Sequence, residues 1–232
     1  ADKIKNLLAQ GSLTPLTRLV LTNAIYFKGD WANQFKPTMT RPMPFHVNEA
    51  QKVDVPMMRQ SGSFLFAETD AVKVLELPYV GNELSMVLVL PKGKPEEFAQ
   101  TLDLARLHEW QGMVARQEVD IYLPKFKFET QYELKELLSD MGMVDAFELP
   151  PADFSGISGH KDLYITKVIH KAIIEVNEEG SEAAAATAVV VGTKAVMHKP
   201  VFKADHPFLF MIRHNETGSI LFMGRVANPT TK

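Results

Sequence analysis

Residues 178–191 read Glu-Glu-Gly-Ser-Glu-Ala-Ala-Ala-Ala-Thr-Ala-Val-Val-Val, and this stretch decides how the fold of the chain is interpreted. It holds no aromatic residue and no large side chain before its valines. Alanine has the highest helix propensity, whereas threonine and valine favour strands. The residues of this segment are compatible with an exposed loop, with a helix and with a strand. Such a segment is able to change its conformation.

The segments on either side of this stretch are mostly strand-like. A continuous apolar run at residues 16–27 predicts a strand buried on both faces, and residues 163–176 predict a second long strand. Further strands are expected at residues 45–58, 63–67, 72–78, 85–90, 119–128, 208–213 and 220–226, turns at Gly81-Asn82, 153–156 and 214–218, and helices at 95–110 and 132–141. The pattern predicts one strand-rich α+β domain with a few helices.

The composition limits the classes of partner. The 232 residues are 46% hydrophobic and 23% charged, which is typical of a globular protein. A net charge of -3 gives no reason to expect nucleic acid as a partner. No apolar run reaches the ~20 residues needed to span a bilayer, so no membrane partner is expected either. The absence of cysteine excludes disulfides and thiol catalysis.

No pattern of catalytic or cofactor-binding residues is visible. The seven histidines lack the His-Glu-x-x-His motif and paired ligand spacing, so no metal site is expected. Gly156-Ile-Ser-Gly159 lacks the spacing of a nucleophile elbow, and no glycine loop for phosphate occurs. We therefore expect no cofactor and no enzyme activity. Asn215-Glu216-Thr217 is a glycosylation sequon, which matters if the protein is secreted by a eukaryote.

Seven short stretches, in the same order along the chain, resemble the serpin family. They are Leu21-Thr-Asn-Ala-Ile-Tyr-Phe-Lys-Gly-Asp-Trp31, Leu123-Pro-Lys-Phe126, Asp153-Phe-Ser-Gly156, His170-Lys-Ala172, Glu178-Glu-Gly-Ser-Glu-Ala-Ala-Ala-Ala-Thr187, His206-Pro-Phe-Leu-Phe210 and Phe222-Met-Gly-Arg-Val-Ala-Asn-Pro229. The resemblance runs from Ala1 to Lys232 and implies the C-terminal three-fifths of a single serpin domain. That fold has a large mixed sheet A, smaller sheets B and C, and an exposed reactive loop, here at about residues 178–200. The helical N-terminal part is expected to be absent or to be a separate polypeptide partner.

The resemblance also implies a mechanism. Serpins are suicide inhibitors of serine proteases: the protease attacks the loop as a substrate and forms an acyl-enzyme, and the cut loop then inserts into the main sheet as a new strand. Loop insertion and the strain that it releases are known properties of the family. The resemblance further implies a metastable, secreted monomer that risks forming loop–sheet polymers.

The residues themselves suit insertion. Alternate side chains of an inserted strand must enter the core, and in one register these are all small or β-branched: Ser181, Ala183, Ala185, Thr187, Val189 and Val191. None is charged, which matters because burial of an unpaired charge is unfavourable. Gly180 can serve as a hinge because it reaches backbone regions forbidden to other residues. The hinge segment comprises Glu178, Glu179, Gly180, Ser181, Glu182, Ala183, Ala184, Ala185, Ala186 and Thr187.

The bond that a protease would cut is placed by counting. Fifteen residues that start at Gly180 end at Lys194, which gives Lys194-Ala195 as the reactive bond, with Thr193 and Val196 as rivals. A lysine here would attract trypsin-like proteases, whose specificity pocket holds an aspartate. Alternatively, Lys194 is an ordinary exposed charge and the loop targets another protease.

Four residues are candidates for control of sheet opening. Asn23 and His170 sit within apolar strands; each is either a satisfied buried polar residue or, as the resemblance implies, part of a hydrogen-bond cluster beneath the main sheet. Trp31 is either a packing residue or, by resemblance, lies where the loop first enters. Lys125 is predicted to pair with Glu178, which would contribute roughly one or two kcal/mol if partly buried and ~0–1 kcal/mol if exposed.

Other functions remain open. A serpin that does not inhibit, such as a carrier or chaperone, is expected to have charged or bulky hinge residues, and Ser181 to Ala186 favour the inhibitor instead. An inert or engineered serpin fragment is a further alternative. An enzyme is the least favoured.

Overall fold

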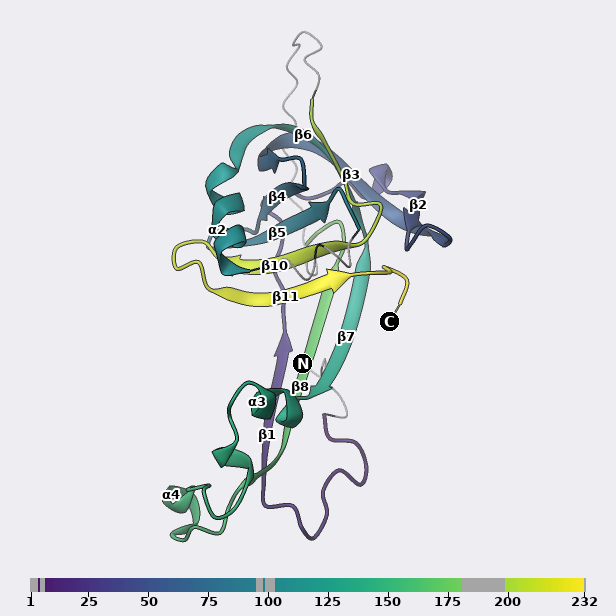
Figure 1. Cartoon of the computed structure of the whole chain (residues 1–232). Helices are drawn as coiled ribbons and strands as arrows, with labels where there is room; N and C mark the ends of the chain where they lie inside the picture. Colours follow the sequence, from purple (N-terminus) through teal and green to yellow (C-terminus); the bar gives the residue numbers. More distant parts are fainter. Residues whose placement is uncertain (1–3, 5–6, 95–97, 99–102, 181–198, 232) are drawn as a thin grey trace. The chain divides into compact units, whose positions relative to one another are not determined.

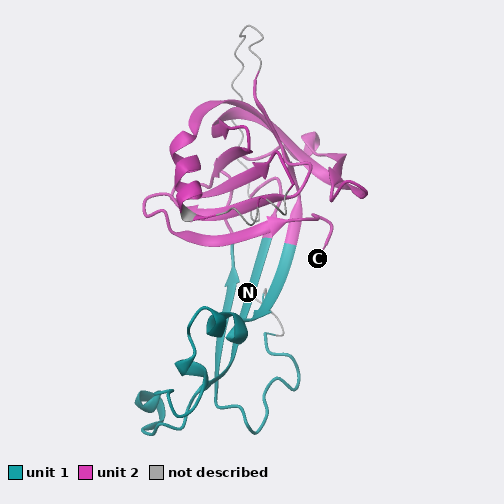
Figure 2. Ribbon diagram, in the orientation of Figure 1, with its two compact units in different colours: residues 1–27, 128–174 teal, residues 28–127, 175–232 magenta. Residues whose placement is uncertain are grey.

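The computed structural model describes residues 4, 7–94, 98, 103–180 and 199–231 (Figure 1). The chain forms two compact units (Figure 2): residues 1–27 with 128–174, and residues 28–127 with 175–232. Each unit is therefore assembled from segments that are far apart in the sequence. Two strands, β7 (Phe126–Glu133) and β8 (Ile165–Val176), contribute residues to both units.

The second unit is built on an eight-stranded mixed sheet. Its strands are β2 (Arg41–His46), β3 (Lys52–Glu68), β4 (Val72–Pro78), β5 (Leu84–Pro91), β6 (Ala115–Pro124), β9 (Val201–Lys203), β10 (Phe208–His214) and β11 (Ile220–Val226). Their order is β11-β10-β5-β4-β3-β6-β9, with β2 paired to β3. The short β9 lies parallel to β6, whereas the other recorded pairs in this sheet are antiparallel.

The core of this sheet is apolar on both faces of β5. Helix α2 (Leu104–Met113) begins at Asp103, whose carboxylate accepts a hydrogen bond of 2.8 Å from the Arg106 amide, a usual N-terminal cap. Its Leu107 and Trp110 join the core cluster that includes Val87 and Leu209. Every side chain of β5 after Leu84 is buried, as a strand with a neighbour on each side and packing on each face requires.

The first unit holds most of a three-stranded sheet. Strand β8 lies between β1 (Leu19–Tyr26) and β7, and β1 runs parallel to β8. The short helices α3 (Lys135–Asp140), η2 (Asp145–Phe147) and α4 (Ser155–Ser158) follow β7 along the chain, and η1 (Pro37–Met39) belongs to the other unit. A small core around Phe147 and Ile165 packs α3, η2 and the residue before α4 against the start of β8.

The strand-rich α+β class is confirmed, and so are the bounds of β4 and β11. Gly81 and Asn82 both have positive φ, at 88° and 56°, as the predicted tight turn demands. The runs at residues 45–58 and 63–67 were predicted as separate strands, but β3 joins their parts in one 17-residue strand. The predicted strand at residues 119–128 is divided at Lys125 into β6 and β7. Of the helix predicted at 95–110, residues 95–97 and 99–102 lie outside the described part.

The prediction that residues 16–27 form a strand buried on both faces is wrong. Leu21 to Ala24, in the middle of β1, are exposed. The physical reason is that β1 is an edge strand with β8 as its one neighbour, and the described residues place no second layer over its centre. Within the described residues, no helix is long and apolar enough to cross a membrane.

We expect Leu88→Ala to destabilise the second unit by about 2–5 kcal/mol, the usual cost of a leucine-sized cavity. Leu88 is 0% exposed at the centre of β5, between β4 and β10. Leu221→Ala, on the 46%-exposed side chain of β11, removes the same atoms and should cost less than about 1 kcal/mol. Urea unfolding followed by tryptophan fluorescence measures both, because both tryptophans, Trp31 and Trp110, lie in this unit. Equal losses would contradict a packed core at β5.

Candidate functional site

The candidate site is the turn that follows β8, residues 177–180, which we call the loop base. The Asn177 amide donates to the Gly180 carbonyl at 3.1 Å, and the Gly180 amide donates back to the Asn177 carbonyl at 3.4 Å. The Asn177 side chain also accepts from the Glu179 amide at 3.0 Å, which is the local hydrogen bond of an Asx turn. The sequence thus closes the turn with its own polar groups before the undescribed residues 181–198 begin.

Trp31 connects the loop base to the eight-stranded sheet. Its backbone amide donates to the Glu179 carbonyl at 2.9 Å, and its indole Nε1 donates to the Asn177 carbonyl at 3.0 Å. The ring stacks on Tyr79, just after β4, with centroids 4.6 Å apart, and both rings are buried. Trp31 is thus a packed side chain whose contacts include the loop base, and its part in sheet opening stays a prediction.

Gly180 lies in close contact with the backbone of residues 29–31. Its φ is +125°, and a Cβ at this position would lie 2.3 Å from the Gly29 carbonyl oxygen and 2.6 Å from the Trp31 nitrogen. Real Cβ atoms do not approach backbone this closely. Only glycine has both the required φ and the required space.

Glu178 is the buried charge of the loop base. Only 8% of the residue is exposed, and its carboxylate accepts from Lys125 Nζ at 2.7 Å and from Thr40 Oγ1 at 2.8 Å. Burial acts to raise the pKa of Glu178, but the hydrogen bonds from Lys125 and Thr40 outweigh it and hold the pKa below its ordinary value. The predicted ion pair between Lys125 and Glu178 is confirmed.

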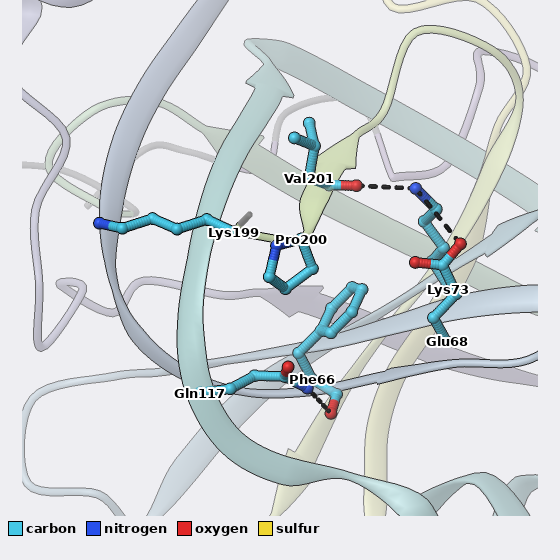
Figure 3. Close-up of a pocket in the computed structure, with 7 residues that line it drawn as sticks. All are labelled: Phe66, Glu68, Lys73, Gln117, Lys199, Pro200 and Val201. Atoms are coloured by element: carbon cyan, nitrogen blue, oxygen red, sulfur yellow. Dashed lines mark hydrogen bonds and ion pairs between the residues drawn. The ribbon is translucent and has the colours of Figure 1, made fainter. Parts of the chain in front are cut away.

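The chain is also anchored on the C-terminal side of residues 181–198, from Lys199 onward. The Asp120 amide donates to the Pro200 carbonyl at 3.0 Å, and β9 then pairs with β6. A cavity of about 600 Å³ lies beside this anchor. Figure 3 shows the residues that line it: Phe66, Glu68, Lys73, Gln117, Lys199, Pro200 and Val201. At its rim the Lys73 ammonium donates to the Val201 carbonyl at 2.8 Å and lies 3.6 Å from Glu68 Oε1.

Asn23 and His170 meet within the first unit. They are opposite each other in the β1–β8 register, and Asn23 Oδ1 lies 3.1 Å from His170 Nδ1. Neither residue is buried, so the buried alternative is wrong for both: Asn23 is exposed because β1 is an edge strand, and His170 is partly exposed. The two residues are nevertheless hydrogen-bonded as a pair.

Several predicted site residues lie outside the described part of the chain. They are the hinge residues Ser181, Glu182, Ala183, Ala184, Ala185, Ala186 and Thr187, and the reactive-bond candidates Thr193, Lys194, Ala195 and Val196. Asn215 is described: its Nδ2 donates to the Asn82 carbonyl at 2.8 Å, so the nitrogen that a glycan would occupy is already hydrogen-bonded. Its glycosylation stays a prediction.

Thr40, Tyr79 and Asn177 were not identified from the sequence as part of the site. Thr40 binds a residue 138 positions away, and nothing in its surroundings signals that contact. Tyr79 follows a strand without any motif. Asn177 directly precedes the hinge, and an asparagine before a glycine-containing acidic stretch is a recognisable turn signal.

Comparison with known proteins identifies the family. The family model described as serpin, serine protease inhibitor, matches residues 1–229. The chain belongs to the serpin family. It is 47% identical over 98% of its length to the leukocyte elastase inhibitor of Xenopus tropicalis and covers 62% of that protein. The chain thus spans about three-fifths of the length of the curated relatives that it matches.

Solved structures share the fold. The structure superposes on uncleaved ovalbumin with a TM-score of 0.85 and 36% identity, over 97% of this chain and 58% of ovalbumin. It superposes on human thyroxine-binding globulin, solved with thyroxine, with a TM-score of 0.88 and 33% identity, over 99% of this chain and 60% of the globulin.

Gly180→Ala should detach the loop base from residues 29–31. The matched control is Gly218→Ala, since Gly218 also has a positive φ, +73°, but no atom within 4 Å of an added Cβ. Both variants bear the backbone strain of roughly 1–2 kcal/mol, and only Gly180→Ala also collides with backbone. We expect hydrogen exchange of the Trp31 amide, which is bonded to Glu179, to accelerate in Gly180→Ala alone. Equal exchange in the two variants would contradict the close contact.

Proposed function

We propose that the chain inhibits serine proteases as a suicide substrate, with the reactive loop at about residues 178–200. The observation that carries the proposal is that both ends of this segment are anchored in one unit. Gly180 is fixed against residues 29–31, and Pro200 is fixed on β6. The elastase inhibitor named among the relatives supports the same activity.

The hinge segment favours insertion over a passive loop. Its alternate side chains are small and uncharged, so they would fit a sheet core without an unpaired charge. A strand gained by insertion forms new ladder hydrogen bonds, each worth about 1 kcal/mol net. No proline occurs between Lys171 and Lys199 to interrupt that ladder.

The reactive bond that we propose is Lys194-Ala195. Attack by the protease serine on the Lys194 carbonyl forms an ester with Lys194 and releases the Ala195 amine. The Lys194 side chain would occupy the specificity pocket of the protease. A lysine there favours a trypsin-like target. The relative's name instead suggests an elastase, whose small pocket would accept Thr193 or Val196.

The four control residues keep their proposed roles. Trp31 and Lys125 both contact the loop base, so opening of the sheet at this point would have to break their hydrogen bonds. Asn23 and His170 bond β1 to β8, and separation of these strands would break that bond as well. The secreted, monomeric state stays a prediction of the resemblance.

A carrier function is the second candidate. Thyroxine-binding globulin was solved with thyroxine, so a serpin fold can hold a small ligand. The cavity beside β9 offers this chain an aromatic ring, Phe66, and an ammonium group, Lys73 (Figure 3). The small hinge residues favour the inhibitor over the carrier.

The direct test is a denaturing gel of the chain with and without trypsin, with elastase in parallel. A stable band heavier than either component would establish covalent trapping and would identify the class of protease. Cleavage without such a band would mean that the chain is a substrate, and it would overturn the inhibitor proposal for the chain as it stands. Sequencing of the cleaved product would then separate Lys194 from its rivals.

Ser181→Arg should convert the inhibitor into a substrate. The variant places a charge on an inserting position, so cleavage is retained while insertion, and with it the heavy band, is lost. Glu182→Arg is the matched control, because Glu182 falls on the other face of the inserted strand. If complexes still formed in full yield with Ser181→Arg, insertion in this register would be excluded.

Glu178→Lys should favour polymerisation on heating. It replaces a buried ion pair with two cations, and loss of one partner of such a pair costs about 3–5 kcal/mol, less where one partner is half-exposed as Lys125 is. Glu175→Lys is the control, since Glu175 also pairs with a lysine at 2.7 Å but at an exposed position. Size-exclusion chromatography after heating should show monomer loss for Glu178→Lys alone; an unchanged monomer yield would count against a locking role for Glu178.

A further inference from the structure

Residues 204–207 connect β9 to β10, and their hydrogen bonds help to hold β9, the strand that follows the loop. The Ala204 amide donates to the Tyr122 carbonyl at 2.9 Å, and the His46 amide donates to the Asp205 carbonyl at 2.7 Å. These bonds attach the connection to β6 and β2. The imidazole of His206 adds a bond to β5, at the carbonyl of Pro91.

Both ring nitrogens of His206 face hydrogen-bond acceptors. Nδ1 lies 3.0 Å from Asp205 Oδ1, and Nε2 lies 2.7 Å from the carbonyl oxygen of Pro91, the last residue of β5. A neutral imidazole carries one N–H and one lone pair, so it can satisfy only one of these acceptors. A protonated ring donates to both.

Asp205 acts as an acceptor because it is ionised. Its second oxygen accepts from Lys203 Nζ at 2.9 Å. Burial acts to raise the pKa of Asp205, but hydrogen bonds from His206 and Lys203 lower it to about 2. The carboxyl group therefore has no proton to give to His206, and both ring nitrogens must supply their own.

We propose that His206 is an imidazolium clasp that joins the C-terminal anchor of the loop to the end of β5 and opens when the ring loses its proton. A neutral ring would present a lone pair to either the Asp205 carboxylate or the Pro91 carbonyl, and that contact would become repulsive. The segment would then keep its backbone bonds to β6 and β2 and the contact of the Lys73 ammonium with the Val201 carbonyl (Figure 3), and it would lose its side-chain bond to the end of β5.

The charges that face the clasp favour the protonated ring on balance. The hydrogen bond to Asp205 raises the pKa of His206; burial and the nearby Lys73 act against it, and the Pro91 carbonyl acts with Asp205. The charged groups around it come from several elements: Lys203 at the end of β9, Asp205 after β9, Lys73 on β4, Lys92 after β5, and Glu68, which pairs with Lys92 at 2.7 Å. His46 contributes its backbone amide, and its side chain is exposed.

The pH dependence has a definite sign. The folded pKa of His206 is raised above its unfolded value of about 6.5. The stability that the clasp contributes is therefore fully present below about pH 6.5 and is lost as the pH rises through the folded pKa. The clasp opens on the alkaline side.

The test combines two measurements on the whole chain. Nitrogen NMR of the His206 ring should show both nitrogens protonated at pH 6.5 and a midpoint above the ordinary value of about 6.5. Hydrogen exchange, corrected for the intrinsic effect of pH, should show protection of the Ala204 amide falling by up to tenfold per pH unit between about pH 6.5 and that midpoint and levelling off above it, as release of one proton requires.

His206→Gln supplies a variant that cannot titrate but can still donate one hydrogen bond. It should remove the pH dependence of Ala204 protection, whereas His46→Gln, which changes an exposed ring nearby, should leave it intact. A ring with a single proton at pH 6.5 would overturn the proposal, and so would an equal pH dependence in His206→Gln and wild type. If His206→Gln does not fold, the ring titration of the wild type decides alone. The outcome does not depend on protease inhibition.

Discussion

The contact of Gly180 with the backbone of residues 29–31 is the constraint on which the rest of the site depends. Because Gly180 has no side chain, the two backbones approach closely. This brings the loop base within reach of Trp31, whose amide donates to Glu179 and whose indole donates to Asn177. The same indole stacks on Tyr79 at the end of β4. One aromatic ring therefore links the loop base to the central strands. A displacement of the loop base would have to disturb that stacking, and this is how a local event at the loop could reach the sheet.

The two anchors of residues 181–198 use different chemistry. The N-terminal anchor is a turn held by backbone contacts and by one buried carboxylate, Glu178. The C-terminal anchor is a three-residue parallel strand, and parallel pairing over so short a length is weak alone. Side chains reinforce it from two directions, Lys73 from β4 and His206 toward β5. Hydrogen bonds that involve a charged group are stronger than those between neutral groups. Two such side chains can therefore stabilise a strand whose own backbone pairing is short.

The sequence predicted what local pattern and family motifs can encode. The strand periodicity predicted β4, β10 and β11, and Lys125 was predicted to pair with Glu178, a contact that the structure shows. Exposure of β1 was not predictable, because a run of apolar residues has the same pattern in an edge strand as in a central one. The role of Thr40 depends on a contact across 138 residues, which no local pattern records. His206 stood within a matching motif, yet its charge state follows only from the two acceptors that the fold brings to its ring.

The two anchors respond to pH in opposite directions. The pKa of Glu178 is held below its ordinary value, so the contribution of Glu178 to stability is present above about pH 4.3 and is lost as the pH falls through the folded pKa. The contribution of His206 is present below about pH 6.5 and is lost as the pH rises through a raised folded pKa. Both anchors therefore hold together only in the interval between the two folded pKa values. Acid loosens the end where insertion would begin, and alkali loosens the end that insertion would leave behind. A change of pH would thus select which end of the loop is released first, because the two ends are secured by groups that lose their charge at opposite extremes.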